Sequence, residues 1–536
     1  GSRFWLRQGP VGRPLRPRPR ARARRMLPCR LGLAGLLLVL VGSSASPDGP
    51  ALPGSCEAAV AGGGWAGVYF AFRLAEAGTR VCVFEASERI GGRTYSHDFL
   101  VGRRRDRFVL DLGAYRFTPD MHLPGDVILK VLKLPVACYE PSCLPANADF
   151  PPPFVFNYTA PLVRIVGPDG MPAGYVTAIE GMVDRIRRLG GQVFLGARLT
   201  DFAPAKSGGR ARLVFGQQAV EAGTVLLNLP RQEILRLPSL RAATPARTVK
   251  MQECVKFDMP GDFFPPGQKF DLGRSLTKAY AFYDEAWWHT RLNKTEGQWP
   301  ANAFIPTNTS LGIPVGIHFN DGPVRCDAPA LGCRGFLQVF YSPSGESFYE
   351  DLRPSPWQPL GVVKAGADAG GRLRQLHAAI MEATAELFSA AGAEPPQEPP
   401  SLLAVGVWDR QGQGYTAPTK VYYSKSASTP GGPDPLERAC GVPGLSEEEY
   451  RRSVLQPLGP GGAGPLVANN DFVAAETERL YGDWAEESLL QAERGLRLLG
   501  HGRPAWLDAS YYEAKVLGGL EGVAPPPAAA AVPVVV

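Results

Sequence analysis

Residues 57–85 read EAAVAGGGWAGVYFAFRLAEAGTRVCVFE, and this stretch decides the fold. A short apolar strand pattern at 57–60 runs into three glycines, and a helical pattern follows from Val68 to Ala77. Gly78 stops the helix, and residues 80–85 have the pattern of a second strand. This order predicts a complete βαβ unit.

The glycines Gly62, Gly64 and Gly67 follow the spacing G-x-G-x-x-G around Trp65 and Ala66. The first permits a tight turn, the second lets the backbone approach a pyrophosphate, and the third lets helix and strand pack closely. The helix N-terminus then points at the phosphates. Glu85 ends the second strand, where an acid can bond a ribose hydroxyl. A glycine-rich turn alone is common, but this context predicts dinucleotide binding.

Residues 85–93 read EASERIGGR. A double glycine followed by an arginine brings backbone amides and a guanidinium to a second side of the diphosphate. Surface charge is the alternative for Arg89 and Arg93, and their position directly after the ribose acid argues against it. The stretch resembles the E-A-x-x-R-x-G-G-R motif of the flavin-containing amine oxidase superfamily, and the resemblance implies FAD as the cofactor.

Further segments between residues 58 and 499 resemble the same superfamily. They are Asp111-Leu112-Gly113-Ala114, Gly181-Met182 before an amphipathic helix, the apolar strand 225–230 ending in proline, and Ala475-Glu476-Thr477 followed by Trp484 and Glu486. The resemblance implies the following cofactor-binding residues: Gly62, Gly64, Trp65, Ala66, Gly67, Glu85, Ala86, Arg89, Gly92, Arg93, Gly113, Ala114, Tyr115, Arg116, Glu476, Trp484 and Ala485.

The implied fold class is α/β, with a discontinuous FAD-binding Rossmann-like domain of the GR2 type and a mixed-sheet substrate domain. We expect the FAD-binding domain to comprise residues 55–117, 172–250 and 462–502. The substrate domain, with surface insertions, would comprise 118–171 and 251–461. Residues 1–46 have the pattern of a leader, and the low-complexity tail 523–536 is predicted to be disordered.

The stretch from Lys278 to Trp288 resembles the superfamily segment in which a strand-end lysine precedes an aromatic pair. The resemblance implies that Lys278 holds a water against flavin N5. An ammonium there would aid the electronics of the reduced flavin and its reaction with oxygen. An exposed lysine at a strand end is the alternative.

Leu112-Gly113-Ala114-Tyr115-Arg116 is similar to the L-G-x-x-R of L-amino-acid oxidases. The similarity implies that Arg116 forms a bidentate pair with a substrate carboxylate, and a planar guanidinium suits this task. Trp484 falls where those oxidases place an aromatic wall, and Tyr415 is the nearest candidate for their carboxylate-binding tyrosine. A structural role for Arg116, bonded to loop carbonyls, stays open.

The implied reaction is transfer of a hydride from the α-carbon of a primary amine or L-amino acid. The imine is hydrolysed to a carbonyl product and ammonia, and oxygen becomes hydrogen peroxide. Ala474, Ala475 and Glu487 stand where the superfamily commonly has glycine, and extra side-chain atoms beside a cofactor can displace the backbone. The open alternatives are an FAD-dependent desaturase or isomerase, a prenylcysteine-type oxidase, and a non-catalytic flavin-binding protein.

The chain of 536 residues has a formal charge of +6, but its first thirty residues hold ten arginines and no acid. Without them, 47 basic residues face 51 acidic ones, so the body has no nucleic-acid footprint. The apolar run 31–41 is too short to span a bilayer and is followed by the small residues 43–46. This order predicts a secretory signal, a secreted or lumenal protein, and no stable membrane span in the mature chain.

Eight cysteines lie outside the leader. Cys138 with Cys143 and Cys326 with Cys333 are predicted local disulfides, and Cys82, inside a strand pattern, is expected to be a buried free thiol. Three N-x-[ST] sequons are candidate glycan acceptors, Asn157, Asn293 and Asn308. The six histidines are scattered, and the cysteine pairs lack zinc-like spacing, so no metal site is predicted.

Overall fold

The structure is a computed structural model. It describes residues 50–139, 162–205, 209–253, 276–303, 305–327, 332–342, 346–355, 358–408, 437, 440–459, 464–469 and 485–520. These residues belong to one compact unit, 48–536. The predicted leader and the tail 523–536 lie outside them.

The first sheet contains the predicted βαβ unit. Its strand order is β7 (Gln192–Phe194), β2 (Val81–Phe84), β1 (Ser55–Ala61), β10 (Gln218–Leu227), β9 (Ala211–Phe215) and β8 (Asp201–Ala203), with β20 (Leu466–Val467) also paired to β10. Strands β7, β2, β1, β10 and β20 are parallel to one another, whereas β9 pairs antiparallel with both of its neighbours, β10 and β8. The α/β Rossmann-like architecture predicted from the glycine motif is confirmed.

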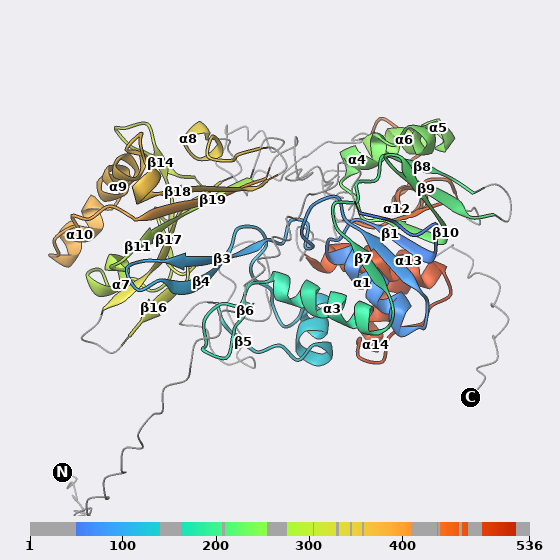
Figure 1. Cartoon of the computed structure of the whole chain (residues 1–536), viewed down its shortest axis with the longest axis horizontal. Coiled ribbons are helices and arrows are strands. Elements are labelled where there is room, and N and C mark those ends of the chain that lie inside the picture. Colours follow the sequence, from blue (N-terminus) through green and yellow to red (C-terminus); the bar gives the residue numbers. More distant parts are fainter. Residues whose placement is uncertain are drawn as a thin grey trace, which may run out of the picture. The chain divides into compact units, whose positions relative to one another are not determined.

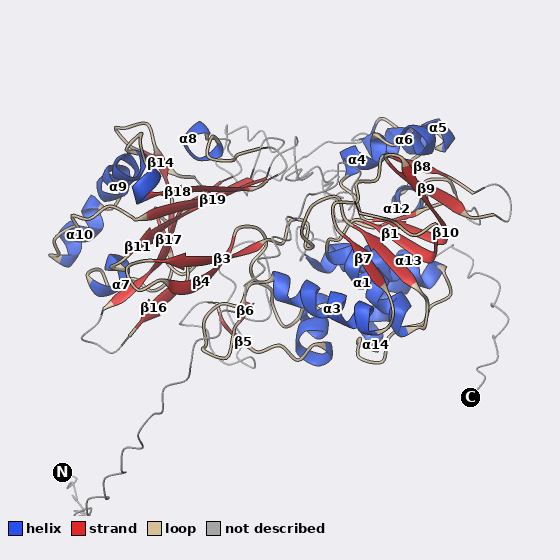
Figure 2. Ribbon diagram, viewed as in Figure 1, coloured by secondary structure: helices blue, strands red, loops and turns tan. Residues whose placement is uncertain are grey.

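Helices cover both faces of this sheet (Figures 1 and 2). On one face α1 (Trp65–Glu76) packs against α3 (Val176–Arg188) and α13 (Ala485–Leu498). Only Glu76 of α1 is not buried, because almost every other residue of the helix is apolar. Tyr69 and Arg73 of α1 both bond Glu493 of α13, so the C-terminal helix is joined to the first helix.

The other face carries α4 (Arg231–Leu235), α5 (Pro238–Ala243), α6 (Ala246–Glu253) and α12 (Glu447–Leu455). Buried residues between 442 and 454 belong to this core, and Met121, Leu123, Val163 and Ile165 belong to the core around α1. Both segments were expected to belong to the substrate domain. Their apolar side chains pack on the first sheet instead, a long-range contact that no local pattern reveals.

The second sheet has the order β12 (Gln298–Trp299), β15 (Ile317–His318), β17 (Cys333–Ser342), β11 (Leu276–Tyr283), β19 (Leu402–Trp408) and β18 (Leu360–Lys364), and β16 (Val324–Cys326) also pairs with β17. All pairings among these strands are antiparallel, where the sequence predicts a mixed sheet. Short links such as 327–332 join antiparallel neighbours, whereas parallel strands need long crossovers.

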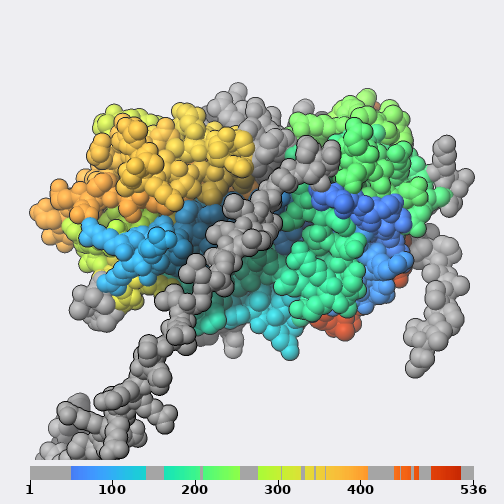
Figure 3. Space-filling model, in the orientation of Figure 1, coloured from blue at the N-terminus to red at the C-terminus, as the bar shows by residue number. Residues whose placement is uncertain are grey.

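One face of the second sheet packs against α7 (Trp287–Thr290), α8 (Ser347–Glu350), α9 (Arg372–Ala383) and α10 (Ala385–Ala391). The other face packs against the hairpin of β3 (Ser96–Val101) and β4 (Asp106–Asp111). In Figure 3 this light-blue hairpin lies beside the yellow and orange residues of the second sheet and its helices. Because β3 begins shortly after Gly92, the hairpin carries the chain from the first sheet to the second.

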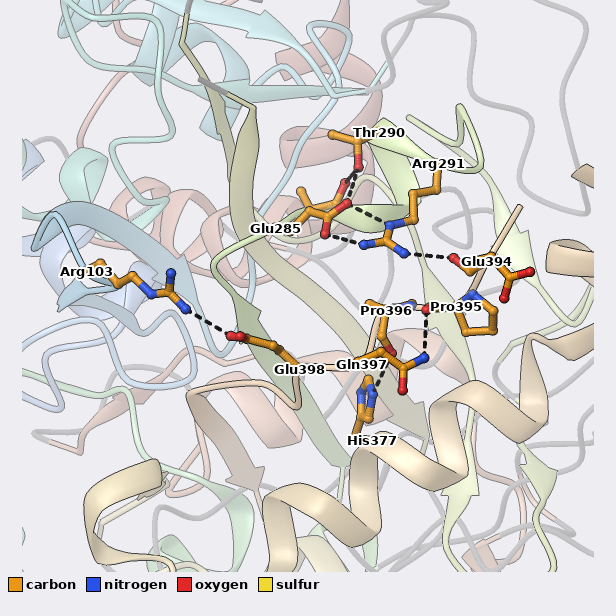
Figure 4. Close-up of polar contacts among 11 residues, drawn as sticks. Arg103, Glu285, Thr290, Arg291, His377, Glu394, Pro395, Pro396, Gln397 and Glu398 are labelled. Carbon is orange, nitrogen blue, oxygen red and sulfur yellow. Dashed lines mark hydrogen bonds and ion pairs between the residues drawn. The ribbon is translucent and has the colours of Figure 1, made fainter. Parts of the chain in front are cut away.

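Polar contacts lie at the edge of the second sheet and its helices (Figure 4). Arg103, at the hairpin tip, pairs with Glu398 at 3.0 Å. Arg291 donates to the carbonyl of Glu394 at 2.8 Å, and His377 lies 3.1 Å from the carbonyl of Pro396. Exposed ion pairs contribute about 0–1 kcal/mol each, so the apolar core beneath the hairpin holds it more strongly than the Arg103–Glu398 pair does.

Two disulfides are complete within the described residues. Cys326–Cys333 is bonded as predicted. Cys56–Cys82 joins β1 to β2, so the expectation of a free thiol at Cys82 is wrong. The strand pattern around Cys82 gave no sign that the neighbouring strand brings Cys56 to a Cα distance of 6.1 Å. Cys138 is also disulfide-bonded, while its predicted partner Cys143 lies outside the described residues.

Among the helices that the structure describes, none has the length and apolar character needed to cross a membrane.

Candidate functional site

The glycine turn after β1 has no room for side chains. Gly62 has φ +107°, and a Cβ there would lie 2.1 Å from the carbonyl oxygen of Asn228. A Cβ on Gly67 would lie 2.0 Å from the carbonyl oxygen of Gly62. Helix α1 begins at Trp65 without a side-chain cap at Gly64, so its first N–H groups face the turn. This is the geometry of an anion site at a helix N-terminus.

Glu85 lies beside this turn. One carboxylate oxygen, Oε2, accepts a hydrogen bond from the backbone of Gly63 at 2.7 Å, and Oε1 accepts from the backbone of Ser87 at 2.8 Å. Because a carboxylate oxygen has room for two hydrogen bonds, Oε2 keeps one acceptor position for a ribose hydroxyl. Ala86, the next residue, is half-buried.

The second predicted segment lies directly against the turn. The Gly91 amide donates to the Gly63 carbonyl at 2.8 Å, and Gly92 is so close that a Cβ on it would lie 3.4 Å from Gly64 Cα. Arg89 donates to the Gly92 carbonyl at 2.8 Å, and its guanidinium lies 4.2 Å from the centre of the Tyr95 ring. Arg89 therefore holds the double-glycine loop in place.

The third segment, 111–116, packs against Arg93. Ala114 donates its amide to the Arg93 carbonyl at 3.1 Å, and a Cβ on Gly113 would lie 1.9 Å from that carbonyl oxygen. The glycine turn, the double-glycine loop and Gly113 thus form a continuous backbone surface.

Lys278 reaches this surface from β11. Its Nζ donates to the Gly113 carbonyl at 2.6 Å and lies 3.5 Å from the centre of the Tyr115 ring. The residue is only 1% exposed, so the alternative of an exposed strand-end lysine is wrong. Burial lowers the pKa of Lys278 well below its ordinary value, and the charge of Asp111 opposes this. Burial also raises the pKa of Asp111, to about 6.

Arg116 lies among aromatic rings, with its guanidinium 4.6 Å from the ring centres of both Tyr115 and Tyr139. Two further buried residues, which the sequence analysis did not single out, belong to the same cluster. His318 ends β15, and Asp321 follows it; His318 Nδ1 lies 3.8 Å from Asp321 Oδ2. Burial, together with the charges of Arg116 and Lys278, lowers the pKa of His318 to about 3.

Asn228 is a second residue that the sequence analysis missed. It donates from Nδ2 to the carbonyl of Ala468 at 2.7 Å, which ties the C-terminal segment to the turn. Its Oδ1 is buried without a hydrogen-bond partner among the described residues and faces the turn, where a Cβ on Gly64 would lie 2.9 Å from it. Asn228 is the one polar residue in an otherwise apolar strand motif, 225–229, and that was the available signal.

Several predicted residues lie outside the described residues, namely Tyr415, Ala474, Ala475, Glu476 and Trp484. Ala485 begins α13, and Glu487 is buried in its first turn, where Oε1 accepts from Gln491 at 3.1 Å. Between them, Glu486 accepts from the backbone of Leu123 at 2.9 Å, and burial raises its pKa to about 7.

These residues fit a dinucleotide cofactor. Gly62, Gly64 and Gly67 form a cradle that any Cβ would fill, α1 presents its amides to the cradle, and Glu85 retains an acceptor position beside it. A pyrophosphate and an adjoining ribose need these groups.

A family model and several solved structures are similar to this chain. Residues 60–123 match a family described as an NAD(P)-binding Rossmann-like domain. No curated protein matches the sequence significantly. Similar solved structures include a putrescine oxidase mutant from a redesign of cofactor binding, at 15% identity, TM-score 0.46 and coverage of 82% of this chain and 97% of that one. Wild-type putrescine oxidase bound to putrescine has 15% identity, TM-score 0.44 and coverages of 83% and 99%.

A putative protoporphyrinogen oxidase from Exiguobacterium sp. 255-15 has 13% identity, TM-score 0.45 and coverages of 82% and 98%. Similarity at this level does not assign an activity to the chain.

Proposed function

We propose that this chain is an FAD-dependent oxidase that removes a hydride from the α-carbon of a primary amine or L-amino acid. One observation carries the proposal. The glycine turn, the double-glycine loop and Gly113 form one surface, and Lys278, buried, donates to that surface at Gly113. Such a surface supports a cofactor that extends from the turn toward the second sheet.

The backbone around Gly62–Gly67 would bind the pyrophosphate, Glu85 the ribose, and Arg93 the second side of the diphosphate. Glu476, Trp484 and Ala485 would complete the flavin end. When bound, FAD supplies the hydride acceptor and the reduction of oxygen to hydrogen peroxide. The remaining task of the protein is to orient the amine and to exclude water.

Lys278 would act at the flavin ring. An ammonium has three donors, and the Gly113 carbonyl takes one, so two remain for a water at the ring edge. Since burial lowers the pKa of Lys278, the side chain can exchange a proton with such a water more readily than an exposed lysine can.

Arg116 would bind the carboxylate of an amino-acid substrate, and the side chains of Trp484 and Tyr415 would line the substrate site. After oxidation, water hydrolyses the imine to the carbonyl product and ammonia. A desaturase, isomerase or prenylcysteine-type oxidase would present an apolar channel at this place. The buried polar cluster of Arg116, Lys278 and Asp321 favours a small charged substrate.

The test uses purified protein, its visible spectrum, and a panel of L-amino acids and amines with peroxide as the readout. We expect a yellow chromophore that an amine bleaches in the absence of oxygen. Bound FAD that no amine bleaches would contradict the oxidase and favour the non-catalytic alternative.

A variant of Arg116 tests whether this residue binds the substrate carboxylate. Arg116→Ala should slow the oxidation of substrates that carry a carboxylate and leave the oxidation of simple amines unchanged. Arg164→Ala is the matched control, because Arg164 lies 5.0 Å from the same Tyr139 ring and donates to the Tyr139 carbonyl at 2.6 Å. Equal loss with both substrate types in Arg116→Ala would refute the assignment.

We also propose that the leader directs the chain to a secretory compartment. Disulfides such as Cys56–Cys82 form in oxidising compartments, and the sequon residues Asn293 and Asn308 are exposed. Expression in a secreting eukaryotic host should yield a protein whose electrophoretic mobility increases after glycosidase treatment. Retention in the cytosol would contradict this.

A further inference from the structure

The cluster around Arg116 contains a carboxylate for which the proposed function has no role. Asp321 follows β15, and its side chain is 1% exposed. It lies beside Tyr115 and Arg116, which follow β4, and the charge of Lys278 in β11 acts on its neighbour His318. Such a carboxylate needs donors, because a buried acceptor without a partner costs about 1–3 kcal/mol.

Half of this requirement is met. The hydroxyl of Tyr115 bonds the carboxylate. The other oxygen, Oδ2, has no hydrogen-bond partner within the described part of the chain. His318 Nδ1 lies 3.8 Å from Oδ2, which is too far for a hydrogen bond. Asp321 therefore presents one buried acceptor position.

The surrounding charges favour a cationic donor at that position. Burial raises the pKa of Asp321 to about 6, and the charge of Arg116 opposes the rise, so the carboxylate is mostly ionised at neutral pH. His318 is neutral there because its own pKa is lowered to about 3. A buried, ionised carboxylate is stable only with a hydrogen-bonded or charged partner.

We propose that Asp321 binds the amino group of an α-amino acid whose carboxylate is bound by Arg116. The two side chains then bind the two charged groups of the zwitterionic amino acid. This inference rests on the proposed function, since it deepens the substrate assignment made there. It names an amino-group site that no motif in the sequence indicated, because Asn320-Asp321-Gly322-Pro323 has the composition of an ordinary turn.

The same contact has a chemical consequence. A hydride leaves the α-carbon readily only when the nitrogen lone pair is available, so the ammonium must first lose a proton. Asp321 takes it: one N–H bond breaks, one O–H bond forms at the carboxylate, and the substrate becomes a neutral amine beside a neutral acid. A carboxyl group whose pKa is raised by burial is a better acceptor than an exposed one.

The experiment uses the FAD-loaded protein with its flavin pre-reduced, so that no turnover occurs, and measures binding by calorimetry. Three matched probes are used because aromatic rings surround Arg116: L-phenylalanine, 2-phenylethylamine without the carboxylate, and 3-phenylpropanoate without the amino group. Asp321→Asn and Arg116→Gln are compared with the wild type. Asp351→Asn, at an exposed carboxylate, is the control.

Asp321→Asn should weaken the binding of L-phenylalanine and of 2-phenylethylamine by about tenfold or more, because one charge-assisted contact is lost. The affinity for 3-phenylpropanoate should stay within about twofold of the wild-type value. Arg116→Gln should show the opposite pattern, weakening the two carboxylate probes. Retained binding of 3-phenylpropanoate shows that Asp321→Asn is folded.

Equal affinities of Asp321→Asn and wild type for the amine probes would overturn the inference, as would the absence of binding of all three probes to the wild type. Loss of all three probes in Asp321→Asn, with flavin absorbance retained, also counts against an amino-group site. If the wild type oxidises amines and Asp321→Asn binds them with normal affinity, this inference is refuted and the proposed function is not. A protein that takes up no FAD refutes the proposed function itself.

Discussion

Lys278 is a buried amine whose described hydrogen bond is to the Gly113 carbonyl, and burial lowers its pKa well below the ordinary value. The sequence marked Lys278 through its local strand motif. It gave no sign of Gly113 as a partner, because the two residues are 165 positions apart. Asp321 and His318 were missed for a related reason: a polar residue is ordinary in a turn or at a strand end, and only burial makes it significant.

Lys278→Met tests the lysine. The thioether fills a similar volume without the ammonium, so FAD should be retained while reoxidation of the reduced flavin by oxygen slows by about tenfold or more, equivalent to at least about 1.4 kcal/mol of activation free energy. Stopped-flow absorbance measures the rate. Lys364→Met, at an exposed lysine of β18, is the control. An unchanged reoxidation rate would remove Lys278 from the reaction.

His318 should make stability depend on pH. Its pKa is about 3 in the folded chain, against 6.5 ordinarily. Between these values the unfolded chain binds a proton that the folded chain does not. The free energy of unfolding is therefore unaffected by His318 protonation above pH 6.5. It decreases as pH falls toward 3, by at most about 1.4 kcal/mol per pH unit.

Asp111 and Asp321, whose pKa values are raised to about 6, act in the opposite direction, so the effect is read as a difference between two proteins. The free energy of unfolding of the wild type minus that of His318→Gln should decrease as pH is lowered from 6.5. Denaturant titration at each pH gives both values. A difference independent of pH would contradict the lowered pKa.

Among helices and strands, the contiguous ones were predictable. The pattern from 57 to 85 yields β1, α1 and β2 because each element packs on its sequence neighbour. Strand β20, which adds to β10 from 240 residues away, and the hairpin β3–β4, which packs on a different sheet from the strands before it, were not predicted. Local pattern carries no information about such partners.

The disulfide between β1 and β2 joins the two strands that carry the glycine turn and Glu85. Replacing both cysteines by serine should lower the free energy of unfolding by about 2–5 kcal/mol and weaken FAD retention. Thermal denaturation and bound-flavin absorbance measure the two effects. The Cys326/Cys333 double variant is the matched control, because its bond closes only a hairpin in the second sheet. Identical FAD loss in both variants would contradict this account.

For the molecule as a whole, the Rossmann-like architecture and its cofactor-facing backbone followed from the sequence, because glycine spacing reflects steric demands that few other residues satisfy. The allocation of 118–171 and 442–454 to a sheet did not, since many apolar segments can cover either core. The cluster of Arg116, Lys278 and Asp321 depends on groups after β4, in β11 and after β15 meeting in space, and no single segment encodes that meeting.

FAD should stabilise the whole compact unit. A ligand at 100 times its dissociation constant adds about 2.7 kcal/mol to the free energy of unfolding, which should raise the melting temperature by a few degrees. Differential scanning fluorimetry of flavin-free protein with FAD, and with NAD⁺ as the comparison, measures this. Stabilisation by NAD⁺ with none by FAD would contradict the flavin assignment and favour a nicotinamide enzyme.

The bond from Asn228 to Ala468 also governs when this protein can mature during its synthesis. At roughly 5–20 residues per second, a ribosome needs roughly 12 to 48 seconds to make the 240 residues between them. Throughout that interval the edge of β10 that awaits β20 is open to other strands or to a chaperone. The contact that ties the C-terminal segment to the glycine turn therefore forms only after residue 468 has been made.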